Sequence, residues 1–230
     1  FSYDILIAAM AFVGLSIYTL CYIPYFTLGH NLGDLVGLQS QMFGYHYDLK
    51  ATHPYGSKWW QWPFILRPIS YYYHDFRPRT MLQNNMACCV AEIIAIPNPA
   101  VWWGGLISVP FVAWLAVREL NKAYILLVTA YLLQWLPWIT SPRVAFEYHF
   151  FPNLAIICLA NAILLQRLWR YGTTLKVERG WSWPKFTVAG YMLVVVGLAA
   201  FFYPIWAGVH VPWNVWDARM WHWLMGNQWV

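Results

Sequence analysis

The residues best suited to chemistry lie in one short link, SPRVAFEYHF (141–150), between two apolar segments. Arg143, Glu147 and His149 fall within seven residues of one another in this link. The planar guanidinium group of arginine matches a pair of phosphate oxygens, and an unpaired charge beside apolar segments is costly. Two hypotheses follow: either Arg143 binds a phosphate group, or Arg143 and Glu147 form a surface ion pair that caps the following helix.

Two histidines, His46 and His53, lie in the aromatic stretch 39–73, where Asp48 is the nearest acid. A metal ion needs further histidine, cysteine or carboxylate ligands at fixed geometry, and no HxH or HxxxH spacing occurs here. We therefore predict no metal site. The two histidines either hydrogen-bond to a polar head group or have a structural, capping role.

Aromatic side chains are concentrated in the same stretch, at Trp59, Trp60, Trp62 and Tyr71–Tyr73. Such amphipathic rings collect at membrane–water interfaces, with the apolar body in lipid and the polar edge in water. Their faces also match the apolar side of a sugar ring. The stretch therefore predicts a membrane-surface platform, which is either an interfacial belt or a binding surface for a sugar-bearing head group.

Recognisable catalytic motifs are absent from the sequence. It contains no carboxylate pair spaced for acid–base catalysis, no nucleophile elbow, no P-loop and no GxGxxG motif. The four cysteines, Cys21, Cys88, Cys89 and Cys158, show neither a disulfide framework nor a CxxC metal spacing. The residues by themselves predict a binding site and no catalytic residue.

The composition is that of an integral membrane protein. Hydrophobic residues make up 60% of the 230-residue chain and charged residues only 10%, against about 25% charged residues in soluble domains. Lys and Arg outnumber Asp and Glu by 14 to 9. We attribute this excess to membrane topology and exclude nucleic-acid binding, because no basic motif of that class is present.

Uncharged apolar segments predict an all-α membrane protein with about five transmembrane helices. These segments cover residues 5–23, 100–117, 123–139, 150–165 and 186–208. The connecting segments 118–122 and 166–185 lie on one side of such a bundle and together hold seven Lys and Arg residues, so we place them in the cytoplasm. The aromatic stretch, Arg143 and His149 then share the outer face.

The segments between the spans predict shorter elements. Asp34 is placed to cap an amphipathic helix on the membrane surface, in which apolar residues recur at three- and four-residue steps up to Leu49. Three prolines exclude a long helix from residues 54–73, and residues 87–96 are expected to be extended or interfacial. The predicted organisation is a first transmembrane helix (1–27), an outer-face loop with the interfacial helix and the HPY and WW motifs (28–98), a four-helix C-terminal transmembrane region (99–208) and a Trp-rich outer-face tail (209–230).

Five motifs in order carry a family resemblance. They are QMFGYH (41–46), HPYGSKWWQWPFILRPISYYY (53–73), NPAVWWGG (98–105), SPRVAFEYHFFP (141–152) and FFYPIWAG (201–208). In this series the chain resembles the C-terminal membrane region of the protein O-mannosyltransferases, which use dolichyl- or polyprenyl-phosphate mannose, and the bacterial type is the closer likeness. The resemblance extends from Ile5 to about Trp216.

The resemblance implies the C-terminal part of a GT-C glycosyltransferase fold and a polyprenyl-phosphate-linked mannose donor that is transferred to Ser or Thr of secreted proteins. The catalytic acid of the family lies in an N-terminal acidic motif that this sequence does not contain, so no catalytic residue is expected here. We expect that N-terminal half to be lost, to precede these residues or to be on another chain. The residues that the resemblance assigns to a donor or acceptor groove are His46, His53, Tyr55, Trp59, Trp60, Arg67, Arg143, Tyr148 and His149.

The resemblance also implies a bacterial inner-membrane location, with the motif-bearing loop on the periplasmic face. Expected partners are membrane lipids, which we expect to be bound, the N-terminal half or other membrane subunits, and secreted acceptor proteins. No cofactor is expected apart from the lipid-linked sugar as substrate. An alternative hypothesis is a non-catalytic, family-derived structural subunit of a larger membrane complex.

Overall fold

The computed structural model describes residues 3–77, 89–175 and 180–218. These residues form two compact units, Phe1–Lys50 and Ala51–Val230, which are treated separately below. Both are mainly helical, and this confirms the predicted helical membrane fold class. The division into loop, bundle and tail on particular membrane faces stays a prediction.

The first unit contains three helices, α1 (Tyr3–Leu20), α2 (Ile23–Thr27) and α3 (Leu32–Asp48). Pro24 lies in the first turn of α2, where its missing N–H costs nothing and its fixed φ suits a helix. Within this unit Tyr18 of α1 donates a hydrogen bond to Gln39 of α3, with 2.6 Å between Oη and Oε1. A helix, α3, is therefore present where the interfacial helix was predicted, and its position at the membrane surface stays a prediction.

The start of α3 corrects one detail of the sequence analysis. The capping residue is Asn31, whose side-chain oxygen accepts from the backbone N–H of Asp34 at 3.1 Å. Asp34 lies three residues inside and accepts in return from the backbone N–H of Asn31 at 2.8 Å. Each side chain thus accepts from the backbone N–H of the other residue, and the two form a reciprocal capping box. Asp34 stabilises the helix start from within the first turn rather than from the cap position.

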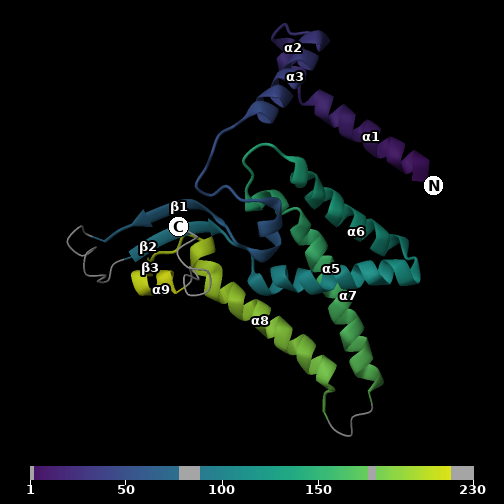
Figure 1. Cartoon of the computed structure of the whole chain (residues 1–230), viewed down its shortest axis with the longest axis vertical. Coiled ribbons are helices and arrows are strands. Elements are labelled where there is room, and N and C mark those ends of the chain that lie inside the picture. The colour runs from purple at the N-terminus through teal and green to yellow at the C-terminus, as the bar shows by residue number, and fades with distance from the viewer. Residues whose placement is uncertain (1–2, 78–88, 176–179, 219–230) are drawn as a thin grey trace. The chain divides into compact units, whose positions relative to one another are not determined.

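Four helices of the second unit are long and apolar enough to cross a membrane. They are α5 (Pro99–Glu119), α6 (Lys122–Trp135) continued by the 3₁₀ helix η2 (Leu136–Thr140), α7 (Asn153–Thr174) and α8 (Trp183–Trp206). Figure 1 shows α5 and α7 crossing, with α6 and α8 on either side. The chain is therefore an integral membrane protein. The apolar part of α1 that can be assessed, Ala8–Leu20, is shorter than these four, so the fifth span stays a prediction.

Side-chain hydrogen bonds fix the first turn of α5 against its neighbours. Asn98 caps α5 by accepting from the N–H of Ala100 at 3.1 Å, and its amide nitrogen donates to the carbonyl of Val195 in α8 at 2.9 Å. Asn161 of α7 donates to the carbonyl of Val101 at 2.9 Å. Such interhelical hydrogen bonds hold helices together where apolar burial alone gives little preference for the partner over lipid.

A small antiparallel sheet lies beside the C-terminal end of α8 (Figure 1). Its strands are β1 (Ile69–Asp75), β2 (Cys89–Ala95) and β3 (Val211–Pro212), in the order β1-β2-β3. The register runs from Ile69 opposite Ala95 to Asp75 opposite Val90, with a shift between Ser70 and Tyr72. The expectation of an extended segment is confirmed for residues 89–95, while the pairing with β1 was not predicted.

The short helix α9 (Trp213–Asp217) is joined to this sheet by a buried hydrogen bond. The indole N–H of Trp216 donates to a carboxylate oxygen of Glu92 in β2 at 2.6 Å. Arg77, just after β1, pairs with Asp75 at 2.6 Å and lies over the ring of Trp213 at 3.7 Å. This ion pair lowers the pKa of Asp75, mainly through the hydrogen bonds from Arg77. The part of the tail that the structure describes, up to residue 218, is therefore packed on the sheet.

Candidate functional site

A polar cavity of about 230 Å³ lies where the segment before the 3₁₀ helix η1 (Trp59–Phe64) meets the link after η2. Lys58 and Arg143 supply two positive charges to its wall, and Ser57 and Ser141 supply two hydroxyl groups. The cavity has the donors that a phosphate group requires, because its oxygens accept from guanidinium, ammonium and hydroxyl groups. Its other lining residues are Trp59, Trp138, Ile139 and Ala145.

Backbone and indole hydrogen bonds hold this cavity in shape. The N–H of Ser57 donates to the carbonyl of Ala145 at 2.8 Å, which joins its two walls. The indole N–H of Trp62 donates to Oγ of Ser57 at 2.9 Å. A Cβ on Gly56 would lie 2.9 Å from a methyl group of Val144, so only glycine allows the two segments to approach this closely. The wall that carries Lys58 is therefore rigidly joined to the wall that carries Arg143.

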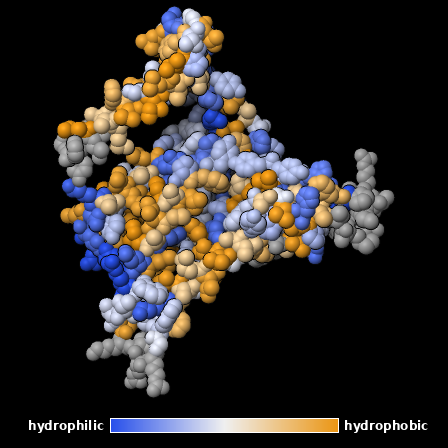
Figure 2. All heavy atoms as spheres, turned by 180° about the vertical axis from the view of Figure 1, so that it is seen from behind, coloured by the Kyte–Doolittle hydropathy of each residue, from blue (hydrophilic) through white to orange (hydrophobic). Residues whose placement is uncertain are grey.

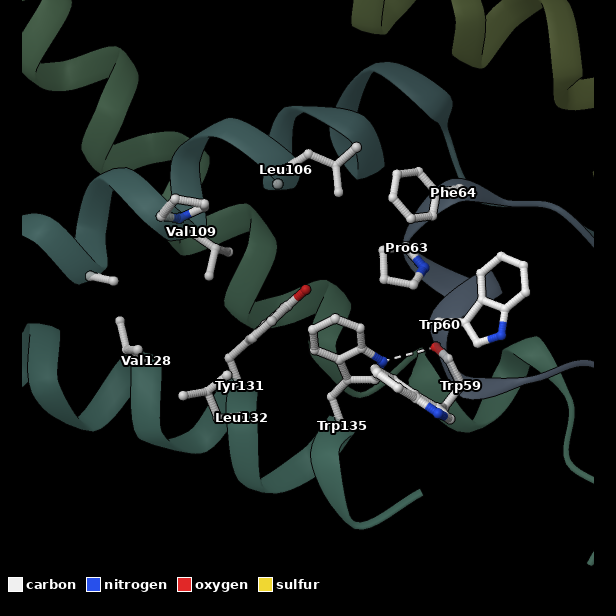
Figure 3. A pocket seen from close by; sticks show the side chains of 13 residues that line it. Trp59, Trp60, Pro63, Phe64, Leu106, Val109, Val128, Tyr131, Leu132 and Trp135 are labelled. Carbon is white, nitrogen blue, oxygen red and sulfur yellow. Dashed lines mark hydrogen bonds between the residues drawn. The ribbon is translucent and has the colours of Figure 1, made fainter. Parts of the chain in front are cut away.

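A second, apolar cavity of about 480 Å³ lies between η1, α5 and α6 (Figure 3). Trp59 lines both cavities, so both border this residue. The carbonyl of Trp59 accepts a hydrogen bond from the indole N–H of Trp135 in α6 at 2.9 Å, shown dashed in Figure 3. The remaining wall consists mainly of apolar side chains, among them Trp60, Pro63, Phe64, Leu106, Val128 and Leu132. The arrangement places a cationic pocket and a pocket suited to an apolar chain on the same tryptophan.

The structure brings only some of the predicted groove residues into these cavities. Trp59 and Arg143 line the polar cavity, and Trp60 lines the apolar one. Lys58, which the resemblance did not assign, lies beside them. Its only signal in the sequence is its position directly before the tryptophan pair. His46 lies on α3 and is described with the first unit.

His53, Tyr55 and Arg67 surround the turn at Pro54. The guanidinium Nε of Arg67 donates to the carbonyl of Pro54 at 3.0 Å, and the N–H of Tyr55 donates to Nδ1 of His53 at 3.1 Å. The His53 ring packs edge-on against Phe146, with 5.1 Å between ring centroids. These contacts place the turn against the link that carries Arg143. Their role in binding stays a prediction.

Tyr148 and His149 belong to the 3₁₀ helix η3 (Glu147–Phe150) and stack on each other, with ring centroids 4.5 Å apart. The His149 ring also packs near Trp138, a residue of the polar cavity, with 4.3 Å between ring centroids. Burial lowers the pKa of His149, and the nearby charge of Arg143 lowers it further, although a hydrogen bond to the Phe146 backbone opposes this shift. His149 is therefore neutral at neutral pH.

Glu147 is the residue that the sequence analysis placed wrongly. The surface ion pair with Arg143, one of the two hypotheses for this link, is absent, since Glu147 is only 1% exposed and neither carboxyl oxygen has a hydrogen-bond partner. Burial raises the pKa of its carboxyl group well above the ordinary range, so the protonated form is favoured. The charge of Arg143 is thus not neutralised by this neighbour.

The pH dependence of stability follows from Glu147. Its pKa is raised on folding. The folding stability that this carboxyl group contributes is therefore fully present below its pKa in the unfolded chain, about 4.3, and is lost as the pH rises through its pKa in the folded protein. We expect the free energy of unfolding of the wild type to fall over that window by about 1.4 kcal/mol per pH unit. Its melting temperature should fall with it, and the melting temperature of Glu147→Gln should fall less. Thermal unfolding in detergent from pH 4.5 to 8 measures this difference.

The matched control is Glu119→Gln, because Glu119 is a half-exposed carboxylate paired with Arg167. It should keep the wild-type slope. Parallel curves for the wild type and Glu147→Gln would show that Glu147 does not titrate as its burial requires.

Metal binding receives no support from the arrangement of ligands. Among residues 3–77, 89–175 and 180–218, no three or more histidine, cysteine, aspartate or glutamate side chains are grouped to hold a metal ion.

Comparison with known proteins identifies the family. The family described as the C-terminal four-TMM region of protein-O-mannosyltransferase matches residues 31–225. The polyprenol-phosphate-mannose–protein mannosyltransferase of Mycobacterium tuberculosis (strain CDC 1551 / Oshkosh) is 23% identical, over 93% of this chain and 45% of that protein. The protein of the same name from Mycolicibacterium smegmatis (strain ATCC 700084 / mc(2)155) is 27% identical, over 74% of this chain and 32% of that protein. The chain thus spans less than half the length of these relatives.

A solved structure shows the same fold. The S. cerevisiae protein O-mannosyltransferase Pmt1–Pmt2 complex bound to the sugar donor matches 87% of this chain and 28% of the matched chain, with a TM-score of 0.62 and 19% sequence identity. The match confirms the GT-C type of helical membrane fold that the resemblance implied. Because the family match extends over residues 31–225, most of the sequence, this chain belongs to the family of the C-terminal four-transmembrane region of the protein O-mannosyltransferases.

Proposed function

We propose that this chain is the C-terminal membrane part of a protein mannosyltransferase that uses polyprenyl-phosphate mannose, and that it binds this donor. The observation that carries the proposal is that Trp59 lines both the cationic and the apolar cavity. A polyprenyl-phosphate sugar has an anionic phosphate next to a long apolar chain, so its two parts match the two cavities. The names of the Mycobacterium and Mycolicibacterium relatives support the same donor.

The residues have different roles in this proposal. Lys58 and Arg143 bind the phosphate oxygens, and Trp59 and Trp60 contact the first units of the polyprenyl chain. The turn with His53, Tyr55 and Arg67 and the pair Tyr148 and His149 line the rest of a donor or acceptor groove. For His46, on the first unit, a groove role stays what the family resemblance implies. None of them is a catalytic residue. The catalytic acid comes from outside these residues, and mannose is transferred to Ser or Thr of secreted proteins.

The proposed location is the bacterial inner membrane, with both cavities on the periplasmic side. The excess of Lys and Arg in segments 118–122 and 166–185 supports this orientation, because such residues favour the cytoplasmic side. The polar cavity lies at the other end of α6, where Trp138 and Arg143 line it. The alternative hypothesis, a non-catalytic structural subunit, is tested by the same binding experiment.

Binding of the purified protein to polyprenyl phosphate tests the proposal. We expect polyprenyl phosphate to bind at least about tenfold more tightly than the uncharged polyprenol of the same length, because the phosphate makes charge-assisted hydrogen bonds worth about 1.5–3 kcal/mol. Quenching of tryptophan fluorescence measures both affinities, since Trp59 and Trp60 line the cavities. Equal affinities would contradict the phosphate site, and no binding of either lipid would favour the structural-subunit hypothesis.

A further inference from the structure

The end of the helix bundle opposite the polar cavity carries a group of cationic side chains. At this end α5 passes into α6 and α7 passes into α8. Arg167 of α7 donates to both carboxylate oxygens of Glu119 of α5, at 2.8 and 2.9 Å, so both connections lie at the same end. We name the described residues 114–124, 167–175 and 180–186 the basic end.

Positive charge dominates the basic end. It holds five cationic side chains and one carboxylate, a net charge of 5 − 1 = +4. Arg167 occupies both oxygens of that carboxylate, Glu119. Among the residues that the structure describes, no acidic side chain pairs with Arg118, Arg170 or Lys185. The five cationic residues are Arg118, Lys122, Arg167, Arg170 and Lys185.

Exposed aromatic rings lie directly beside these cations. The guanidinium group of Arg118 lies over the Trp114 ring at 4.9 Å, and the ammonium group of Lys185 lies over the Trp169 ring at 5.5 Å. Trp169 also packs edge-on against Trp181, with 5.6 Å between ring centroids. Tryptophans that are exposed at the ends of spanning helices lie at the level of the lipid head groups. The cations therefore lie at that level too.

The connection between α7 and α8 holds Lys185 in place. The hydroxyl of Ser182 is buried and donates to the carbonyl of Gly172 at 2.6 Å. A Cβ on Gly172 would lie 2.7 Å from Ser182 Oγ and 3.1 Å from Lys185 Cγ, so the start of α8 packs closely on the last turns of α7. Lys185 is thus held beside the last turns of α7, which also carry Arg170, at a set position in the membrane interface.

We propose that the basic end binds the head groups of anionic glycerophospholipids, such as phosphatidylglycerol, in the membrane leaflet away from the two cavities. Figure 2 shows hydrophilic side chains gathered over this end of the helices, next to the apolar side chains of the spans. The charge complementarity is between a phosphodiester anion and Arg118, Arg170 and Lys185, with which no acidic side chain of the described residues pairs. Positive charges that only orient the protein in the membrane need not bind any particular lipid. The proposed site differs because it binds anionic lipids more tightly than uncharged or zwitterionic ones. The proposal does not rest on donor binding.

Native mass spectrometry of the purified protein in detergent, titrated with dioleoyl-phosphatidylglycerol or dioleoyl-phosphatidylcholine, tests the proposal. We expect the wild type to prefer phosphatidylglycerol. The double variant Arg170→Gln/Lys185→Gln should bind it about 25-fold more weakly, at about fivefold for each lost charge, with no change for phosphatidylcholine. The charge-conserving control Arg170→Lys/Lys185→Arg should retain the preference.

Two outcomes would overturn the proposal: equal affinity of the wild type for the two lipids, or unchanged phosphatidylglycerol binding by the double glutamine variant. Circular dichroism and the melting temperature of each variant show that it is folded. If the glutamine variant unfolds, the same titration of the wild type at rising salt is decisive, because screening must remove the preference of these exposed charges for the anionic lipid.

Discussion

Replacement of Arg143 by alanine is expected to weaken binding of polyprenyl-phosphate mannose by about 10- to 150-fold. Arg143 lines the polar cavity, and its buried neighbour Glu147 forms no ion pair with it. Charge-assisted hydrogen bonds to a phosphate are worth about 1.5–3 kcal/mol, which corresponds to that change in affinity. Isothermal titration calorimetry with polyprenyl phosphate, or donor competition in a transfer assay, measures the loss.

Two further variants identify the cause of this loss. Arg143→Lys keeps the charge but loses the planar pair of donors, so its affinity should lie between those of the wild type and Arg143→Ala. Arg118→Ala removes the same type of side chain from the opposite end of the bundle and should leave donor binding unchanged. If Arg143→Ala and Arg118→Ala bind the donor equally well, the phosphate role of Arg143 is wrong.

Replacement of Trp62 by alanine should give the largest loss of stability, about 3–5 kcal/mol in the free energy of unfolding. Trp62 is fully buried, and its indole N–H donates to Ser57 at 2.9 Å. Its carbonyl accepts from the indole N–H of Trp102 in α5 at 2.8 Å. The substitution leaves an internal void and removes the indole N–H that donates to Ser57. Both changes lower the stability of the fold and loosen the wall of the polar cavity.

The control for Trp62→Ala is Trp60→Ala. Trp60 is the same residue type two positions earlier, but it is 45% exposed, so its loss should cost much less stability. Thermal unfolding followed by circular dichroism in detergent compares the two variants. Equal melting temperatures would show that the burial of Trp62 does not stabilise the protein as its packing requires.

Elements that depend on local pattern could be predicted from the sequence. The four long helices at residues 99–119, 122–140, 153–174 and 183–206 follow from apolar runs of spanning length. The amphipathic pattern after Asp34 predicted α3, although the reciprocal cap with Asn31 shifted its start. The ordered motifs predicted the family, which the match over residues 31–225 confirms.

Elements that depend on distant partners could not be predicted. Strand β1 pairs with β2 across an intervening segment, and β3 joins β2 from more than 100 residues further along the chain. Lys58 shares a cavity with Arg143 because two hydrogen bonds bring separate segments together, from the N–H of Ser57 to Ala145 and from the indole N–H of Trp135 to Trp59. The spacing of these residues along the chain does not indicate that they are in contact.

Arg143 and Glu147 show most clearly the difference between what local sequence pattern predicts and what contacts between distant segments decide. The sequence by itself determined the residue types in the link 141–150, the membrane class and the position of the spans, because composition and periodicity act locally. The tertiary structure decided that Glu147 turns into the core while Arg143 faces a cavity with Lys58. The physical reason is that burial and pairing of a charge depend on which segments pack against it, and those segments are distant in the chain.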